Sequence, residues 1–160
     1  MIEEDLHRDI RNTLKKHGLR YSRARESILE FFREKGGHVG AEEIYLALRQ
    51  GNRVVSLSTV YLNLNALCEA GLIRRFRGEN GKTLYDGNVE PHYHVICKET
   101  GEIIDLPALR VEGLPLGLYL KHRIEAATGW QVDEPTLELR GLSPGAHRQN
   151  PKTHRQRDGD

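Results

Sequence analysis

Cysteine is scarce in this sequence, which contains only Cys68 and Cys97 among 160 residues. Two thiols far apart along the chain cannot form a disulfide framework or a zinc cage by themselves, so we expect both to be reduced. Long apolar runs are also lacking, and no stretch approaches the roughly 20 residues that span a bilayer. The first ten residues include acidic side chains and no apolar segment, which is unlike a secretory signal, so we expect a cytoplasmic protein.

Neither positive nor negative charge dominates over the whole chain, whose formal net charge is +1. That balance hides an asymmetry, because residues 1–86 carry 15 Lys and Arg against 12 Asp and Glu, whereas residues 87–140 carry 5 against 9. The N-terminal half is therefore the better partner for a polyanion. A surplus of this size does not by itself predict nucleic-acid binding.

The spacing of apolar residues in the first half predicts four helices, at about residues 5–16, 23–35, 41–50 and 56–70. A glycine follows each of them, as is common where a helix ends. Two strand-like runs come next, and Asn80-Gly81 between them is a strong hairpin signal. Helices followed by a hairpin in this order are typical of a winged helix-turn-helix, which we expect over residues 1–86.

The second half predicts a smaller domain over residues 92–140, after a hinge at 87–91. It contains the short β-rich runs HYHVIC and GEIIDL, a helix over about 116–127 and a last strand over 130–140. The predicted fold class is thus α+β, with the winged helix-turn-helix followed by a small α/β dimerisation domain. Its core is small, so we expect dimerisation to complete it. Residues 141–160 lack apolar periodicity and predict a disordered tail.

The helix at 56–70 holds the position of a recognition helix, whose early residues meet DNA bases in the major groove. With its leucines turned inward, Ser58, Thr59 and Tyr61 face outward or lie at the margin. Hydroxyl groups bind phosphates, an aromatic ring can contact thymine methyl groups, and the arginine-rich run at 74–77 suits backbone contacts. The same pattern also fits a metal-free winged helix that binds another protein.

The sharpest local motif is His92-x-His94. On a strand, residues i and i+2 point the same way, so both imidazoles can reach one ion. Asp86 lies shortly before them, and an antiparallel partner strand would bring Asp105 beside them. Imidazole and carboxylate without thiolate suit Mn, Fe, Co or Zn.

Three other interpretations of these residues stay open at this point. The histidines could be surface residues or a hydrogen-bonded pair, or could form the two-His-one-carboxylate iron site of a mononuclear non-haem enzyme. His38 follows a Gly-Gly turn far away in sequence, and spacing does not link it to the motif.

Together these segments resemble the Fur family of metalloregulators. The likeness runs in order over about residues 5–140, through GLRYSRARESILEFF, GGHVGAEEIYLAL, SLSTVYLNLNALCEAGLI, LYD, HYHVIC and GEIIDL. It is greatest to the PerR-like and manganese-sensing branches. The resemblance implies a homodimeric, metal-dependent repressor that binds double-stranded operator DNA and controls metal homeostasis or the peroxide stress response.

The resemblance also implies which residues act. The five regulatory metal ligands fall on His38, Asp86, His92, His94 and Asp105. For DNA, the family pattern indicates Tyr61, together with Arg20 and Arg25 before and within the second helix. Five ligands would fill the open positions that an oxygenase needs, so we do not expect an enzyme.

The ligand set and two departures from the family pattern narrow the metal chemistry. Three imidazoles and two carboxylates suit Mn(II) or Fe(II), although Zn(II) would also bind in vitro. Iron with peroxide would, by analogy with PerR-like members, oxidise His38 or His92. The auxiliary site of iron-sensing members is not expected, because Pro91 and Tyr93 stand where its ligands would be.

The second departure concerns the structural zinc that family members usually hold with two Cys-x-x-Cys pairs. The first pair falls here on Cys97 and Thr100, and the second on Ser143 and Ala146, so three of the four thiols are missing. Hydroxyl and methyl groups cannot replace thiolates on zinc, and we expect no four-cysteine structural zinc.

Overall fold

The computed structural model describes residues 2–133, 135 and 137–149. The chain forms two compact units that divide between Val89 and Glu90, a point inside the predicted hinge at 87–91. Among the described residues, no helix is long and apolar enough to cross a membrane.

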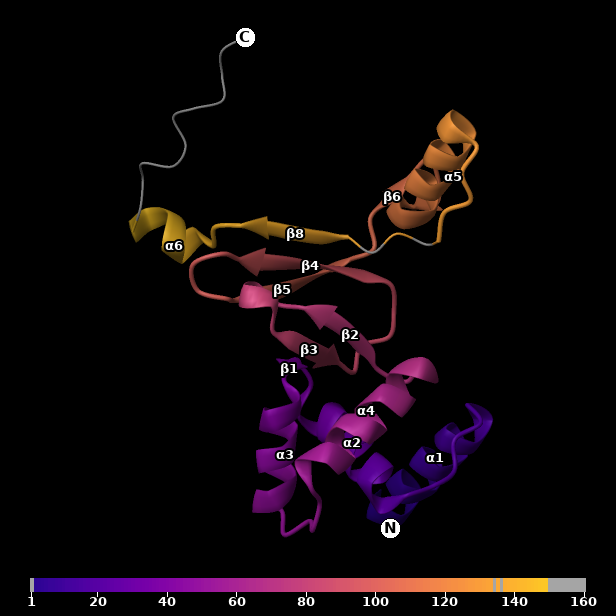
Figure 1. The fold of residues 1–160 in the computed structure, drawn as a ribbon, viewed down its shortest axis with the longest axis vertical. Coiled ribbons are helices and arrows are strands. Elements are labelled where there is room, and N and C mark those ends of the chain that lie inside the picture. The colour runs from indigo at the N-terminus through magenta and orange to yellow at the C-terminus, as the bar shows by residue number, and fades with distance from the viewer. Residues whose placement is uncertain (1, 134, 136, 150–160) are drawn as a thin grey trace. The chain divides into compact units, whose positions relative to one another are not determined.

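Four helices make up most of the first unit (Figure 1), and they confirm the predicted segments to within three residues at either end: α1 (Ile2–Lys16), α2 (Arg23–Lys35), α3 (Ala41–Gln50) and α4 (Leu57–Glu69). Serine caps two of them. The Ser22 hydroxyl accepts from the Arg25 amide at 3.2 Å, and the Ser56 hydroxyl accepts from the Thr59 amide at 3.1 Å.

The core of this unit lies where the four helices converge. Ile10 and Leu14 of α1 and Ile28 of α2 are fully buried, and so are Ile44 of α3 and Leu64 of α4. The predicted apolar stripes therefore face this core. Their packing fixes the outward face of α4, where the predicted DNA-contacting residues lie.

A three-stranded antiparallel sheet completes the first unit, in the order β1-β3-β2. The strands are β1 (His38–Val39), β2 (Arg74–Arg77) and β3 (Thr83–Asp86). The predicted hairpin turn is confirmed, because a short 3-10 turn at Glu79–Gly81 joins β2 to β3. Asn80 and Gly81 both have positive φ angles there, 57° and 72°, which explains the Asn-Gly pair. The two-residue strand β1 escaped the sequence prediction.

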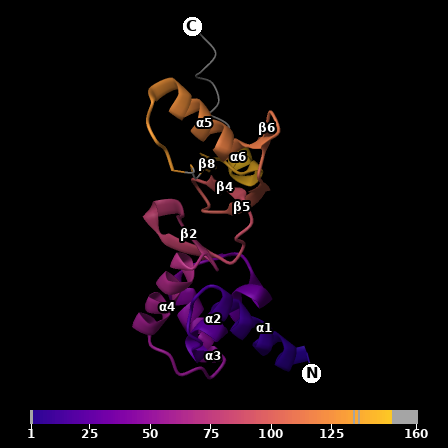
Figure 2. The same cartoon turned by 90° about the vertical axis from the view of Figure 1, so that its right-hand side faces the viewer.

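The second unit has a central β4 (His92–Cys97) paired antiparallel with β5 (Ile103–Pro107) and parallel with β8 (Glu138–Gly141). A small hairpin of β6 (Arg110–Val111) and β7 (Leu114–Pro115) leads into α5 (Leu116–Thr128), the predicted helix. Figure 2 shows α5 and β6 extending to one side of this sheet.

Two predictions for this unit are wrong in part. None of the described residues at 130–133, 135 and 137 lies in a strand, and β8 begins only at Glu138. Pro135 has no amide hydrogen to donate to a strand ladder, which favours this late start. The predicted tail at 141–160 is not disordered over its first part, because α6 (Pro144–Gln149) forms there and Ala146 is only 3% exposed. The rest of that tail lies outside the described residues.

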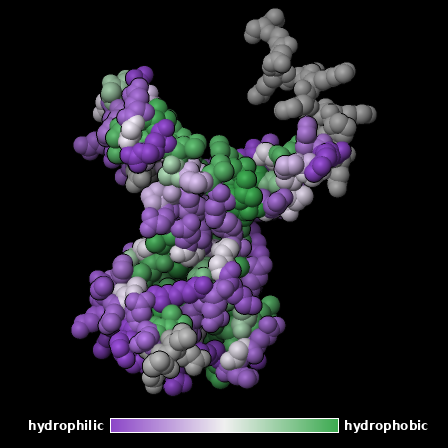
Figure 3. Space-filling model, turned by 180° about the vertical axis from the view of Figure 1, so that it is seen from behind, coloured by the Kyte–Doolittle hydropathy of each residue, from purple (hydrophilic) through white to green (hydrophobic). Residues whose placement is uncertain are grey.

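The second unit leaves many apolar side chains on its surface, visible as green areas in Figure 3. Trp130 is 76% exposed, and Leu109 and Ile104 are each about half exposed, at 53% and 51%. Its buried residues are few, mainly Tyr93, Ile96 and Cys97 on the central strand. Exposed apolar side chains on a domain with so few buried ones are available for contact with a partner.

Candidate functional site

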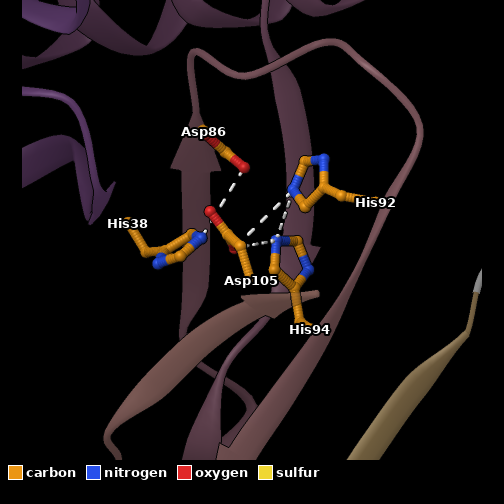
Figure 4. A group of neighbouring side chains, drawn as sticks. All are labelled: His38, Asp86, His92, His94 and Asp105. Carbon is orange, nitrogen blue, oxygen red and sulfur yellow. Dashed lines mark hydrogen bonds and ion pairs between the residues drawn. The ribbon is translucent and has the colours of Figure 1, made fainter. Parts of the chain in front are cut away.

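His38 and Asp86 form the first group of candidate metal ligands, within the first unit (Figure 4). They are directly opposite each other in the β1–β3 pair, and His38 Nε2 lies 3.6 Å from Asp86 Oδ2. The His38 ring also stands edge-on to Phe76, with the centroids 5.3 Å apart. The Asp86 carboxylate is 3% exposed, and its Oδ1 accepts from the Asn88 amide at 2.7 Å. Both side chains are therefore held in place by packing and hydrogen bonds.

The turn before β1 brings His38 to this position. Gly36 and Gly37 follow α2 with φ angles of 58° and 80°, which glycine adopts without strain. This reverses the chain so that His38 and Val39 pair with β3. The Gly-Gly pair was therefore the available sequence signal, although it does not reveal which strand His38 joins.

His92, His94 and Asp105 form a second group, within the second unit (Figure 4). The prediction that an antiparallel strand brings Asp105 beside the histidines is confirmed, because β4 and β5 pair His94 with Asp105. The two Nε2 atoms are 3.0 Å apart, and Asp105 Oδ1 lies 3.5 Å from His94 Nε2 and 3.8 Å from His92 Nε2. Two nitrogens and one oxygen thus converge from neighbouring strands.

A backbone contact fixes the tautomer of His92. Its Nδ1 lies 2.7 Å from the Glu90 carbonyl oxygen, which can only accept, so Nδ1 carries the proton. In a neutral imidazole Nε2 then has the free electron pair, and it faces His94 and Asp105. An outer hydrogen bond of this kind orients histidine ligands in metal sites. The group suits a divalent cation with a preference for nitrogen and oxygen ligands.

The positions that replace the two Cys-x-x-Cys pairs also lie together in the second unit, but as a hydrogen-bonded cluster around one thiol. Cys97 is a free, buried cysteine, and its Sγ accepts from the Ser143 amide at 3.3 Å. Hydrogen bonds from the Thr100 side chain and from Ser143 lower the pKa of the Cys97 thiol to about 6. Among the described residues, no group of three or more metal-binding side chains includes this cysteine.

The outward face of α4 carries the predicted DNA-contacting side chains. Ser58 and Tyr61 are exposed, and Thr59 is half-buried near the cap of the helix. The Tyr61 hydroxyl donates to Glu42 Oε1 on α3 at 2.7 Å, a contact that the sequence did not reveal. This hydrogen bond lowers the pKa of the Glu42 carboxyl and raises the pKa of Tyr61.

A groove of about 710 Å³ lies beside this face, between α4 and the β2–β3 hairpin. Arg75, Arg77 and Lys82 bring three positive charges to its lining, against the single carboxylate of Glu42. Arg20 precedes α2 and Arg25 lies in its first turn, where Arg25 donates to the Arg20 carbonyl oxygen. Both the groove and this pair suit contacts with a negatively charged backbone.

Comparisons with known proteins agree with this architecture. Residues 16–139 match the model of the ferric uptake regulator family. The chain belongs to this family. The Bacillus subtilis peroxide operon regulator is 33% identical over 133 residues, which are 81% of this chain and 86% of the relative. Members are metal-dependent transcriptional repressors rather than enzymes, and so is this chain.

Solved structures show the same fold. The Campylobacter jejuni peroxide stress regulator is 30% identical with a TM-score of 0.62, and the alignment covers 82% of this chain and 94% of that one. The Pseudomonas aeruginosa ferric uptake regulator, solved with manganese, is 26% identical with a TM-score of 0.67, covering 84% and 98%. Both confirm the α+β fold of a winged-helix domain followed by an α/β domain.

Proposed function

We propose that this chain is a cytoplasmic homodimer that represses transcription when Mn(II) or Fe(II) is bound by His38, Asp86, His92, His94 and Asp105. The observation that carries this proposal is the second group of ligands, where the His92 tautomer and the register of Asp105 with His94 prepare a nitrogen and oxygen site. The manganese in the related Pseudomonas aeruginosa structure supports the choice of metal.

Both groups serve the same ion in this proposal. Each unit supplies imidazole and carboxylate from paired strands, and neither group reaches four ligands alone. Five nitrogen and oxygen ligands suit Mn(II) or Fe(II), whereas Zn(II) prefers four. The short segment between Asp86 and His92 lies at the division between the units and acts as the hinge.

Shared ligation gives the protein its switch. Joining His38 and Asp86 of one unit to the three ligands of the other favours one arrangement of the two units over the alternatives. DNA affinity rises only by the difference in metal affinity between the binding-competent arrangement and the others. Repression therefore depends on His38 and Asp86 as much as on the three ligands of the second unit.

DNA binding is assigned to the first unit. Ser58, Thr59 and Tyr61 on α4 enter the major groove, while Arg20 and Arg25 contact the sugar-phosphate backbone. We assign the homodimer interface to the second unit, where a partner would bury exposed apolar side chains such as Leu109 and Ile104. Such a dimer would present two recognition helices to the two halves of an operator.

Peroxide is the proposed second signal, on the ground that the Bacillus subtilis and Campylobacter jejuni relatives are named for peroxide. The target is His38 or His92. One oxygen of hydrogen peroxide is transferred to a carbon of the imidazole and the other leaves as water, so the histidine gains one oxygen atom. Loss of a ligand then releases the protein from DNA.

A DNA-binding titration tests the whole proposal. Operator affinity is measured with Mn(II) for the wild type and for His38→Ala, His92→Ala and Asp105→Ala, with His17→Ala as the control. We expect each ligand variant to lose metal-dependent binding and the control to keep it. Unchanged metal-dependent binding in all three ligand variants would contradict the assignment. A second arm replaces Mn(II) by Fe(II), adds peroxide, and searches His38 and His92 for added oxygen by mass spectrometry.

A further inference from the structure

A third group of candidate metal ligands lies between α1 and α2, inside the first unit. His7 on α1 points its Nδ1 at two carboxylates of α2, 3.0 Å from Glu26 Oε1 and 3.2 Å from Glu30 Oε1. Glu26 and Glu30 are four residues apart, so they share one face of the helix. The three ligand atoms all lie within 4.8 Å of one another.

Contacts from outside the group hold both carboxylates in this orientation. The Tyr21 hydroxyl donates to Glu26 Oε2 at 2.7 Å, and Arg53 donates to Glu30 Oε2 at 3.3 Å. Both Oε1 atoms are thereby turned toward His7. Arg11 in turn covers the Tyr21 ring, with its guanidinium 4.5 Å from the ring centroid. Outer contacts that fix the direction of ligands are characteristic of metal sites.

At His7 Nδ1 two carboxylate oxygens meet a single nitrogen, while Tyr21 and Arg53 contact the other oxygens of the same two carboxylates. One imidazole nitrogen, which can carry a single proton, faces two carboxylate oxygens whose side chains are only 5% and 13% exposed. Burial raises the pKa of Glu30, and the nearby Glu26 raises it further against the opposing effect of Arg53. Hydrogen bonds from Tyr21 and His7 outweigh burial at Glu26 and lower its pKa. A divalent cation would satisfy both carboxylates at once.

We propose that His7, Glu26 and Glu30 bind a divalent metal ion, with Zn(II) as the best match. Three nitrogen and oxygen ligands plus one water complete the tetrahedron that zinc prefers. Ligand atoms in such a site are ~3.4 Å apart, close to the separations around His7 Nδ1. The His7 side chain is 40% exposed, which leaves access for water and for the ion. This ion would link α1 to α2. Its binding does not depend on the five-ligand site proposed above, which is called the hinge site below.

The test counts bound zinc on the tag-free, full-length protein by equilibrium dialysis and elemental analysis. The parent protein carries His38→Ala, His92→Ala and His94→Ala, so that the proposed hinge site is removed. We expect this parent to retain one equivalent of Zn(II) and His7→Ala added to it to retain none. His17→Ala is the matched control, because His17 directly follows α1 and its ring Nδ1 lies 2.9 Å from the Thr13 carbonyl oxygen of that same helix.

Two further variants separate ligation from general loss of structure. Tyr21→Phe keeps all three ligands and should weaken Zn(II) binding roughly 10- to 100-fold, as loss of an outer contact does. Glu34→Gln, one turn beyond Glu30 on α2, removes a carboxylate that acts on Glu30 through its charge, so the protein should still retain one equivalent of Zn(II). Equal zinc content in the His7→Ala and His17→Ala proteins would overturn the proposal. If the hinge site itself does not bind metal, the wild type and the variant without His38, His92 and His94 will instead contain the same amount of zinc.

Discussion

His38 and Asp86 face each other across the β1–β3 pair, with His38 Nε2 3.6 Å from Asp86 Oδ2. The first unit therefore prepares an imidazole and a carboxylate for a shared ligand without help from the second. Asp86 has two separate tasks in this arrangement. One carboxylate oxygen faces His38, and the other accepts from the Asn88 amide.

These two tasks of Asp86 are separable by substitution. Asp86→Asn keeps an oxygen for the Asn88 amide but removes the charge, so we expect Mn(II) affinity to fall more than roughly tenfold with little change in thermal stability. Asp86→Ala removes both, and should in addition cost about 1 kcal/mol of stability for the lost hydrogen bond. Metal titration and thermal unfolding measure the two effects.

Asp9→Asn is the control, since this exposed aspartate on α1 pairs with Arg33. It should leave Mn(II) affinity unchanged. If Asp86→Asn binds Mn(II) as well as the Asp9→Asn protein does, Asp86 is not a ligand.

The helices and the hairpin could be predicted from sequence because their signals are local. Ser22, Ser56 and the Asn80-Gly81 pair mark boundaries that the structure confirms. The failures involve segments whose structure depends on distant partners. The strand β1 has two residues and exists only through its pairing with β3, and Ala146 alone is buried among the α6 side chains that the structure describes.

The residues of the candidate site show the same difference between local signals and dependence on distant segments. His92 and His94 share a face of one strand, so their pairing follows from local geometry, and Asp105 follows from one hairpin. No periodicity connects His38 with Asp86, because a β-bridge between distant segments has no local signature. The Glu42–Tyr61 contact joins two helices across the same unit and was invisible for the same reason.

Helix α6 offers a direct test of the corrected C-terminal boundary. Ala146→Arg places a large charged side chain at a position that is 3% exposed, and we expect a loss of about 1–3 kcal/mol in the free energy of unfolding. Gly145→Ala is the control, because a methyl group there meets nothing within 4 Å. Chemical denaturation compares the two. Equal stability of both variants would mean that this segment does not pack on the domain.

Among the described residues that line the groove beside α4, Glu42 alone carries a carboxylate, and it accepts a hydrogen bond from the Tyr61 hydroxyl. We expect Glu42→Gln to strengthen operator binding roughly fivefold at low salt, because a negative charge close to DNA phosphates is removed, an effect of about 1 kcal/mol at a protein surface. The gain should shrink as salt rises.

Glu69→Gln, at the far end of α4, provides the matched charge change. Tyr61→Phe and the variant that combines it with Glu42→Gln complete a double-mutant cycle. If the hydroxyl contributes to DNA binding only while Glu42 orients it, Tyr61→Phe will weaken binding in the wild type and have no effect in the Glu42→Gln background. Weaker DNA binding by Glu42→Gln alone would show that orientation of Tyr61 outweighs the repulsion.

The lowered pKa of the Cys97 thiol leads us to expect that the stability of the protein depends on pH. Hydrogen bonds from Thr100 and Ser143 lower its pKa from 9 to about 6 in the folded state. An acid whose pKa is lowered by folding stabilises the fold above its unfolded pKa, and this contribution is lost as pH falls toward the folded value. We therefore expect the difference in urea midpoint between wild type and Cys97→Ser to grow steadily from pH 6 to pH 9. A constant difference over that range would show that Cys97 remains protonated, and that the Ser143 amide donates to a neutral thiol.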